Sequence, residues 1–207
     1  KETKKNESKF SYESIKDQNF FFKSFYILCS FIKFKPLQLG YFYSPQIAEY
    51  VKNNHEKYDL IFYQSFRTAQ YLPKFSNKKN ILDMGDLYSK NYEQTYRKSF
   101  FLNPIKIIYF IESKLIKRYE NFCFNNFDKI LLFSKKEIDA VEKKYKKKLL
   151  QINFGINKIK KKFKFHKSNY KIIFIGNITY SPNRKACYEF AKNILPKILE
   201  IYSNIEF

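Results

Sequence analysis

Short apolar runs that alternate with helix-like stretches constrain the fold of this chain more than any other feature. Each run is four or five residues long, and several are continuously apolar, which is typical of strands buried on both faces of a sheet. The alternation predicts an α/β fold with a parallel, doubly wound sheet covered on both faces. The predicted strands are Leu60–Tyr63, Asn80–Met84, Lys129–Phe133, Leu149–Asn153 and Lys171–Ile175.

Helices are predicted between these runs, and their ends carry recognisable signals. Residues 36–40 include a proline and a glycine and are expected to break the chain after the first helix. Ser134 followed by Glu137 is a capping-box pattern, and Pro196 is expected to kink or split the last helix. The predicted helices span residues 20–33, 45–54, 66–72, 104–122 and 183–202, with a further one starting at Ser134.

The first helical stretch, Phe20–Phe34, is apolar but is interrupted by Lys23 and Lys33. It is too short to span a bilayer. A buried helix is the expected arrangement, and a helix lying in a membrane interface is the alternative.

The sequence suggests two α/β units of unequal length. Residues 1–18 are polar and predicted to be a flexible lead-in, and residues 19–157 form a Rossmann-like domain. A lysine-rich linker follows at 158–169, and residues 170–207 begin a second Rossmann-like domain. Because the chain starts at Lys1 and stops at Phe207, we take it as a fragment of a longer protein, so a signal peptide is left unpredicted.

Composition excludes some classes of protein and leaves the charge with two explanations. The 24 Phe and 18 Tyr exclude a disordered chain. The 40 Lys+Arg against 19 Asp+Glu give a net charge of +21. This excess reflects either the residue bias of AT-rich coding DNA or an anionic partner. The three cysteines form no CxxC motif and the two histidines have no nearby ligand partners, so reduced thiols and no metal site are expected.

Ligands of parallel α/β sheets bind where strands end, so we look there for site residues. Gly85 lets the chain turn sharply after the second predicted strand, and Asp86 follows as a candidate acid, base or hydroxyl binder. The alternative for Asp86 is a cap on the next helix. Arg67 follows the first predicted strand and suits an anionic or hydroxyl-rich ligand, unless it is a plain surface arginine.

A second candidate site is the polar loop that follows Ile175 and leads into a helix. Backbone N–H groups at a helix start, with two cations nearby, suit a diphosphate. The loop has neither a GxGxxG nor a P-loop pattern, and a plain strand–helix connection capped by Asn183 is the alternative. Its candidate residues are Gly176, Asn177, Tyr180, Asn183, Arg184 and Lys185. By contrast, Glu112, Arg118 and Glu120 are expected to form ion pairs on the surface of the long helix.

Several stretches, taken in order over about residues 30–207, resemble bacterial sugar transferases of the glycosyltransferase family 4 type, which have the GT-B fold. These are Pro36-Leu37-Gln38, Tyr58–Ile61 with Arg67–Tyr71, Ile81–Ser89, Arg118-Tyr119-Glu120, Phe127-Asp128 with Phe133-Ser134, and Phe174–Asn177 with Tyr180–Ala186.

The resemblance implies an acceptor-binding domain followed by the start of a donor-binding domain. It makes Asp86 the catalytic residue, with Arg67, Gly85 and Ser89 binding substrate, and it places the loop after Gly176 at the donor diphosphate. The donor would be a nucleotide-diphosphate sugar, and the acceptor a cell-surface glycan or a lipid-linked glycan. Transfer would retain configuration without a metal, and activity is expected of the longer parent protein.

The same resemblance, with the basic charge, predicts a cytoplasmic protein in peripheral contact with the anionic inner face of the plasma membrane. Two other functions stay open. One is a basic, aromatic nucleic-acid-binding protein, although no nucleic acid is expected because the charge is spread out and no RNP-like or KH-like motif occurs. The other is an inactive, truncated scaffold.

Overall fold

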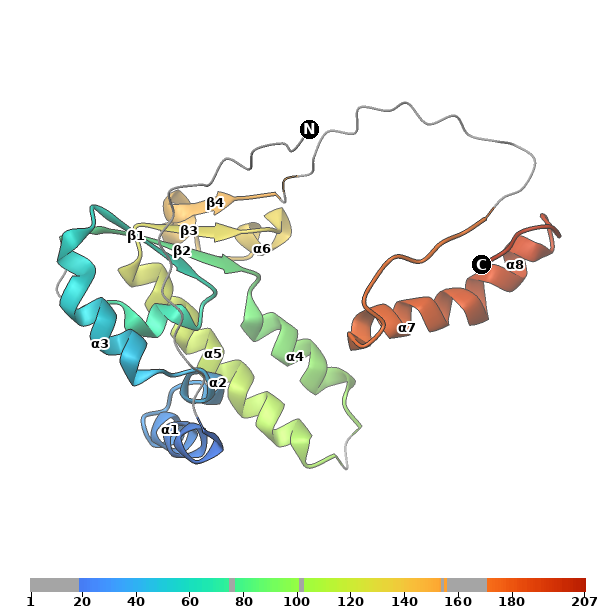
Figure 1. Cartoon of the computed structure of the whole chain (residues 1–207). Helices are drawn as coiled ribbons and strands as arrows, with labels where there is room; N and C mark the ends of the chain where they lie inside the picture. Colours follow the sequence, from blue (N-terminus) through green and yellow to red (C-terminus); the bar gives the residue numbers. More distant parts are fainter. Residues whose placement is uncertain (1–18, 75–76, 101–102, 154, 156–170) are drawn as a thin grey trace, which may run out of the picture. The chain divides into compact units, whose positions relative to one another are not determined.

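A computed structural model of the chain describes residues 19–74, 77–100, 103–153, 155 and 171–207 (Figure 1). The chain divides into two compact units, Lys1–Phe154 and Gly155–Phe207. The predicted lead-in at 1–18 and the predicted basic linker at 158–169 lie outside the described residues.

Unit 1 is built on a parallel four-stranded sheet, as the alternation of apolar and helical stretches predicted. The strands are β1 (Leu60–Gln64), β2 (Lys79–Gly85), β3 (Lys129–Leu132) and β4 (Leu149–Gln151). They lie in the order β1-β2-β3-β4, and every neighbouring pair is parallel. The first four predicted strands are therefore confirmed, and so is the α/β class.

The helices of unit 1 agree with most of the predicted stretches. They are α1 (Phe20–Ile32), α2 (Leu37–Tyr41), α3 (Pro45–Asn54), α4 (Tyr88–Lys98), α5 (Ile105–Asn126) and α6 (Lys135–Asp139), with 3₁₀ turns at His55–Lys57, Thr68–Tyr71 and Lys143–Lys148. Two are additions to the predicted ranges: α2 forms where residues 36–40 were expected only to break the chain, and α4 was given no range, although a helix after Asp86 was part of the alternative for that residue.

The prediction that both sheet faces are covered is wrong for the described residues. Figure 1 shows α3 and α5 on the same side of the sheet. On the other face Phe62 is 53% exposed, Leu150 is exposed, and Ile81 and Leu131 are only half-buried. The strand order explains this result. Right-handed crossovers between consecutive neighbouring strands place every connection on one face, and only a reversal of strand order moves helices to the other.

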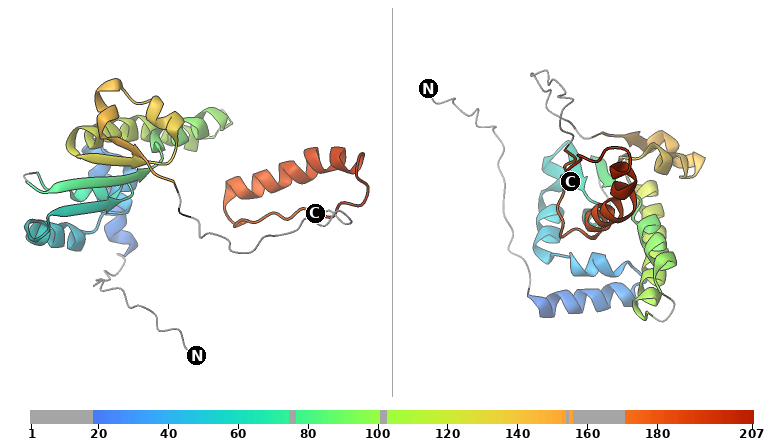
Figure 2. Two further views of the ribbon diagram at one scale, coloured as in Figure 1. Left: turned by 90° about the horizontal axis from the view of Figure 1, so that it is seen from above. Right: turned by 90° about the vertical axis from the view of Figure 1, so that its right-hand side faces the viewer.

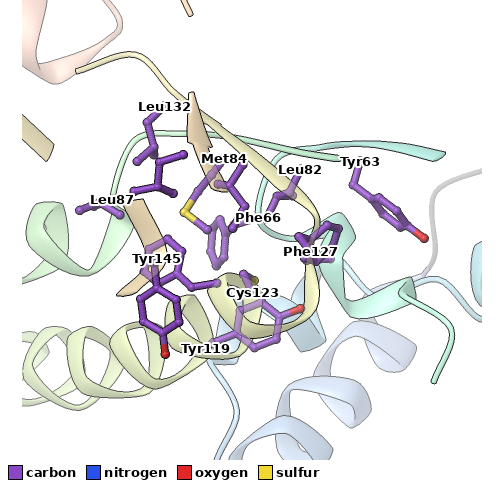
Figure 3. Close-up of a cluster of buried hydrophobic side chains, with 14 of the residues drawn as sticks. Tyr63, Phe66, Leu82, Met84, Leu87, Tyr119, Cys123, Phe127, Leu132 and Tyr145 are labelled. Atoms are coloured by element: carbon purple, nitrogen blue, oxygen red, sulfur yellow. The ribbon is translucent and has the colours of Figure 1, made fainter. Parts of the chain in front are cut away.

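The core of unit 1 lies between the covered sheet face and α5 (Figure 3). Leu82, Ile130 and Leu132 point from the strands and are fully buried. Phe66, from the segment after β1, and Cys123 of α5 meet them from the helix side. This packing fixes the carboxyl ends of β1, β2 and β3, where the candidate site residues begin.

α1 does not fit the expected buried helix. Ser30 is its one buried residue among the thirteen, and most of its phenylalanines are exposed. The expectation failed because the apolar sequence of a helix indicates that it packs against another surface but does not identify that surface.

Unit 2 contains α7 (Ser181–Glu189), a π-helical turn (Phe190–Ile194) and α8 (Leu195–Leu199). The predicted split at Pro196 is confirmed, since a proline without an N–H is tolerated in the first turn of a new helix. The predicted strand at 171–175 is wrong: it forms one isolated parallel bridge, from Lys171 to Glu206, and Ile175 is 92% exposed. A strand needs a paired neighbour along its length, and here the pairing covers a single residue.

Candidate functional site

The turn after β2 brings the predicted catalytic residue to the carboxyl edge of the sheet. Gly85 has a φ of +73°, a left-handed conformation that favours glycine, and a Cβ there would lie 3.0 Å from the Phe133 ring. Asp86 follows with an exposed side chain that forms no hydrogen bond or ion pair to any described residue. The sharp turn predicted at Gly85 is confirmed, and Asp86 is open to solvent.

Asp86 does not cap the helix that follows it, so that alternative is wrong. The N-cap of α4 is Leu87, which makes no side-chain cap hydrogen bond. Instead, carboxylates from distant elements accept from the N–H groups at the start of α4. Glu137 accepts from the Leu87 N–H at 3.2 Å, and Glu120 accepts from the Ser89 N–H at 2.9 Å. The first N–H groups of a helix have no partner within the helix, so these two acceptors satisfy them and hold the turn in place.

Ser89, predicted to bind substrate, is occupied by protein contacts. Its side chain is buried, and its hydroxyl donates to the second carboxylate oxygen of Glu120 at 2.6 Å. The structure therefore gives Ser89 a part in positioning the start of α4. Direct contact with a substrate would require this pair to separate.

Arg67 lies at the same edge of the sheet, next to the start of α4. Its Nε–H donates to Gln38 Oε1 at 2.9 Å, and its guanidinium lies 4.3 Å from the Phe42 ring centroid and 5.6 Å from that of Tyr88. Within the described part of the chain, its two terminal nitrogens have no hydrogen-bond partner. The guanidinium of Arg67 is thus fixed in place, and its terminal nitrogens are available as hydrogen-bond donors. A positioned guanidinium of this kind suits a phosphate or a carboxylate.

The partner of Arg67 is itself fixed by a buried carboxylate. Glu112 of α5 accepts from the Leu37 N–H at 2.8 Å and from the Gln38 N–H at 3.2 Å, and so caps α2. The amide nitrogen of Gln38 lies 3.4 Å from the same carboxylate. A chain of contacts, Glu112 to Gln38 to Arg67, therefore orients the guanidinium.

The expected surface ion pairs on α5 are wrong for its two carboxylates. Glu112 and Glu120 are buried, and both accept from N–H groups. Burial raises the pKa of each carboxyl, and the hydrogen bonds from Leu37 and Gln38, or from Ser89, partly oppose the rise. Burial also raises the pKa of Glu137, and the nearby charge of Asp86 adds to that rise.

A pH-dependent stability follows for Glu120. Because its folded pKa is raised, its favourable contribution is complete below the unfolded value of 4.5 and is lost as pH rises through the folded pKa. We expect wild type to lose stability relative to Glu120→Gln over a pH range that begins at the unfolded value of 4.5 and extends upward. Urea unfolding of both proteins across that range measures the difference. A difference that stays constant, or that grows in favour of wild type, contradicts the raised pKa.

The predicted donor loop lies in unit 2, between Ile175 and the start of α7. Asn177 Oδ1 accepts from the N–H of Thr179 at 2.9 Å, and the Asn177 carbonyl oxygen accepts from the Asn183 side chain at 3.2 Å. Tyr180, not Asn183, is the N-cap of α7, and it makes no side-chain cap bond. The exposed residues of the loop and helix start include Gly176, Tyr180, Arg184 and Lys185. The loop is thus held by its own hydrogen bonds, with its two cations in solvent.

Other features bear on metals, thiols and membranes. In the described ranges, no group of three or more His, Cys, Asp or Glu side chains is arranged to hold a metal ion. Cys29, Cys123 and Cys187 are free thiols, and Cys123 alone of the three is buried. None of the helices that the structure describes combines the length and apolar character required to cross a membrane.

In comparisons with known proteins, no family model, no curated protein and no solved structure matches the chain.

The sequence pointed to Asp86, Gly85 and Arg67, and the structure brings them to one edge of the sheet. It did not identify the groups that hold them. Glu112, Glu120 and Glu137 act on helices far away in sequence, and Glu137 was assigned to a capping box in its own helix. That capping box is wrong: Ser134 is the N-cap of α6, but its side chain makes no cap bond.

Proposed function

We propose that the protein containing this chain is a glycosyltransferase of the GT-B type, which moves a sugar from a nucleotide-diphosphate sugar to a glycan or lipid-linked acceptor. The observation that carries the proposal is the cluster at the carboxyl edge of the parallel sheet. There an exposed carboxylate, Asp86, follows β2, and a held cation, Arg67, follows the neighbouring strand β1. Ligands of open α/β sheets bind at this edge.

Asp86 has the chemistry for the acceptor hydroxyl. Its carboxylate is exposed and has no hydrogen-bond partner among the described residues, so it is able to accept a hydrogen bond from a sugar hydroxyl or to take its proton. The left-handed turn at Gly85 and the carboxylate caps on α4 fix the backbone on both sides of Asp86. A positioned group of this kind contributes to the rate because the entropy cost of orienting it is not part of the activation barrier.

Arg67 has the chemistry for the anionic or hydroxyl-rich part of the substrate. Its Nε is used by Gln38, which leaves the outer edge of the guanidinium for the ligand. In this proposal Arg67 binds the acceptor, and a lipid-linked acceptor supplies a phosphate for it.

The donor is assigned to unit 2. The positive end of the α7 dipole, with the exposed Arg184 and Lys185, has the charge needed to bind the diphosphate and to stabilise it as it leaves. This part of the proposal rests on the resemblance of residues 174–186 to the donor loop of the family. Retention of configuration and independence of a metal are proposed on the same ground.

The test is a mass-resolved transfer assay on the full-length gene product with a panel of UDP- and GDP-sugars. We expect transfer by wild type and a loss of rate of about a hundredfold or more in Asp86→Asn. Arg67→Gln should raise the KM for a phosphate-bearing acceptor more than it lowers kcat. Asp139→Asn, at an exposed aspartate of α6, is the matched control and should keep the wild-type rate.

Two outcomes would overturn the proposal. One is a folded wild-type protein that neither transfers a sugar nor binds any nucleotide sugar. The other is an Asp86→Asn variant as active as the Asp139→Asn control, which would remove Asp86 from the reaction.

A further inference from the structure

α1 is amphipathic, but its apolar side is the side that faces away from the protein. Residues 23, 26, 27 and 30 form the stripe against α2, and it includes a lysine, a tyrosine and a serine. On the opposite side Phe21 is 87% exposed and Leu28 is 56% exposed, and Phe25 and Ile32 complete the same stripe. A helix on a water-facing surface normally has the reverse arrangement.

The contacts of the inner side fix this orientation. Gly40 of α2 lies directly against the backbone of Tyr26 and Ile27. The Tyr26 ring packs on the Tyr43 ring with centroids 4.7 Å apart, and the Lys23 ammonium lies 5.0 Å from the centroid of the Tyr41 ring. α1 would have to leave α2 before its apolar stripe could turn inward.

A second apolar surface lies at the same end of unit 1. The first turns of α5 expose Ile105, Ile107 and Ile108. Figure 1 and the right-hand view of Figure 2 both place α1 and the start of α5 at the end of unit 1 away from the sheet. We call the exposed side chains of α1 and of these turns the α1–α5 face.

The charge around this face has one sign. The sequence has no Asp or Glu from residue 19 to 48 or from 98 to 111, and both stretches contain lysines, among them Lys33, Lys35 and Lys106. The first carboxylate of α5, Glu112, points inward to α2. The face is therefore apolar at its centre and basic at its margin.

A pocket opens just beyond the end of α1, and two of the lysines at the margin of the face line it. It has a volume of about 250 Å³, and its lining includes Lys33, Lys35 and Arg118. Gln70 and Tyr119 also line it, and the Gln70 Nε2 and the Tyr119 hydroxyl are buried with no hydrogen-bond partner among the described residues. Three cations and two unused polar groups suit an anionic headgroup.

We propose that the α1–α5 face binds the surface of an anionic lipid bilayer, with the apolar stripe of α1 among the acyl chains and a lipid phosphate near the pocket. At about 1.5 Å per residue, thirteen residues span about 20 Å, which is too short to cross a hydrocarbon core of about 30 Å. A helix lying in the interface needs only one apolar side and basic flanks, and α1 has both. A second copy of this chain would bring the same lysines together, so charge disfavours self-association as the cover.

The experiment is vesicle flotation of the whole chain, without nucleotide sugar or acceptor, so that its outcome is independent of sugar transfer. The vesicles are phosphatidylcholine alone, or phosphatidylcholine with about one-third phosphatidylglycerol. We expect binding to the mixed vesicles to be at least about tenfold stronger, and to weaken when salt is raised from about 0.1 M to about 0.5 M. Phe21→Gln with Leu28→Gln should reduce binding to both vesicles by about tenfold or more.

Matched variants test whether binding depends on this face or on exposed apolar residues and lysines in general. Phe62→Gln with Leu150→Gln changes the same residue types on the open sheet face and should leave binding unchanged. Lys33→Gln with Lys35→Gln should remove most of the preference for phosphatidylglycerol, and Lys143→Gln with Lys147→Gln, both exposed on the 3₁₀ turn before β4, should not.

The proposal is overturned if wild type floats with neither vesicle, or if the two pairs of apolar variants lose binding equally. It is also overturned if sedimentation of the vesicle-free chain shows a dimer that Phe21→Gln with Leu28→Gln dissociates, because a second copy would then cover the face. Circular dichroism of each variant, with an unchanged helix signal, confirms that a loss of binding reflects the surface and not the fold.

Discussion

Replacing Gly40 with alanine is expected to lower the free energy of unfolding by about 3 kcal/mol and to release α1 from α2. A Cβ at this position would overlap the backbone of Tyr26 and Ile27. Backbone atoms cannot rotate aside as a side chain does, so the two helices must move apart. That movement would also separate Tyr26 from Tyr43.

Urea unfolding measures the loss of stability, and amide hydrogen exchange over residues 20–32 reports whether α1 has come loose. Gly155→Ala is the matched control, since a Cβ there would meet nothing within 4 Å. We expect the control to change the free energy of unfolding by less than about 0.5 kcal/mol. A Gly40→Ala protein with wild-type stability and wild-type exchange would show that α1 is not packed closely on α2. It would also remove the fixed orientation on which the α1–α5 face depends.

The local parts of the fold could be predicted from the sequence. A strand such as β3 is recognised as a short apolar stretch that follows a helix and precedes a cap residue, and here Ile130 and Leu132 are buried as a strand core should be. Gly85 was identified from its place after a strand, and it does adopt a positive φ. In both examples the information lies within a few residues.

The arrangement of these elements could not be predicted in the same way. Whether the second sheet face is covered depends on strand order. An apolar residue such as Phe62 or Leu150 has the same local sequence whether helices cover that face or leave it open. The stretch Lys171–Ile175 has the composition of a strand, yet its only pairing in the described residues is the bridge to Glu206. The inward side of α1 was hidden for a similar reason, because the close approach at Gly40 involves two helices.

The candidate site shows the same division. Asp86 and Arg67 could be located because each closely follows an apolar strand. The groups that hold them could not, because their contacts join residues far apart in sequence: 75 positions separate Leu37 from Glu112, and 31 separate Ser89 from Glu120. A buried glutamate on a helix and a surface glutamate look the same in a sequence, and spacing alone favoured the surface ion pair.

Replacing Glu112 with alanine should therefore destabilise α2 and disturb Arg67, as well as the site of the substitution itself. The change leaves the Leu37 and Gln38 N–H groups without their acceptor and opens a cavity beside α2. We expect the free energy of unfolding to fall by about 3 kcal/mol, the upper range for orphaned buried polar groups combined with lost packing. Glu112→Gln keeps the volume and one acceptor oxygen, so its loss should be smaller, about 1 to 2 kcal/mol.

Glu112→Ala should also disturb Arg67, because Gln38 forms hydrogen bonds with both Glu112 and Arg67. Chemical shifts of the Arg67 side chain should change in Glu112→Ala, and those of Arg97 should not.

Glu93→Ala is the control. Glu93 pairs with Arg97 at an exposed site, and such pairs contribute little to stability, so the urea midpoint should stay at the wild-type value. If Glu112→Ala proved as stable as Glu93→Ala, the carboxylate would not be the cap of α2. If it lost stability while Arg67 kept its shifts, Arg67 would be held by its rings, Phe42 and Tyr88, and Gln38 would have no part in placing it.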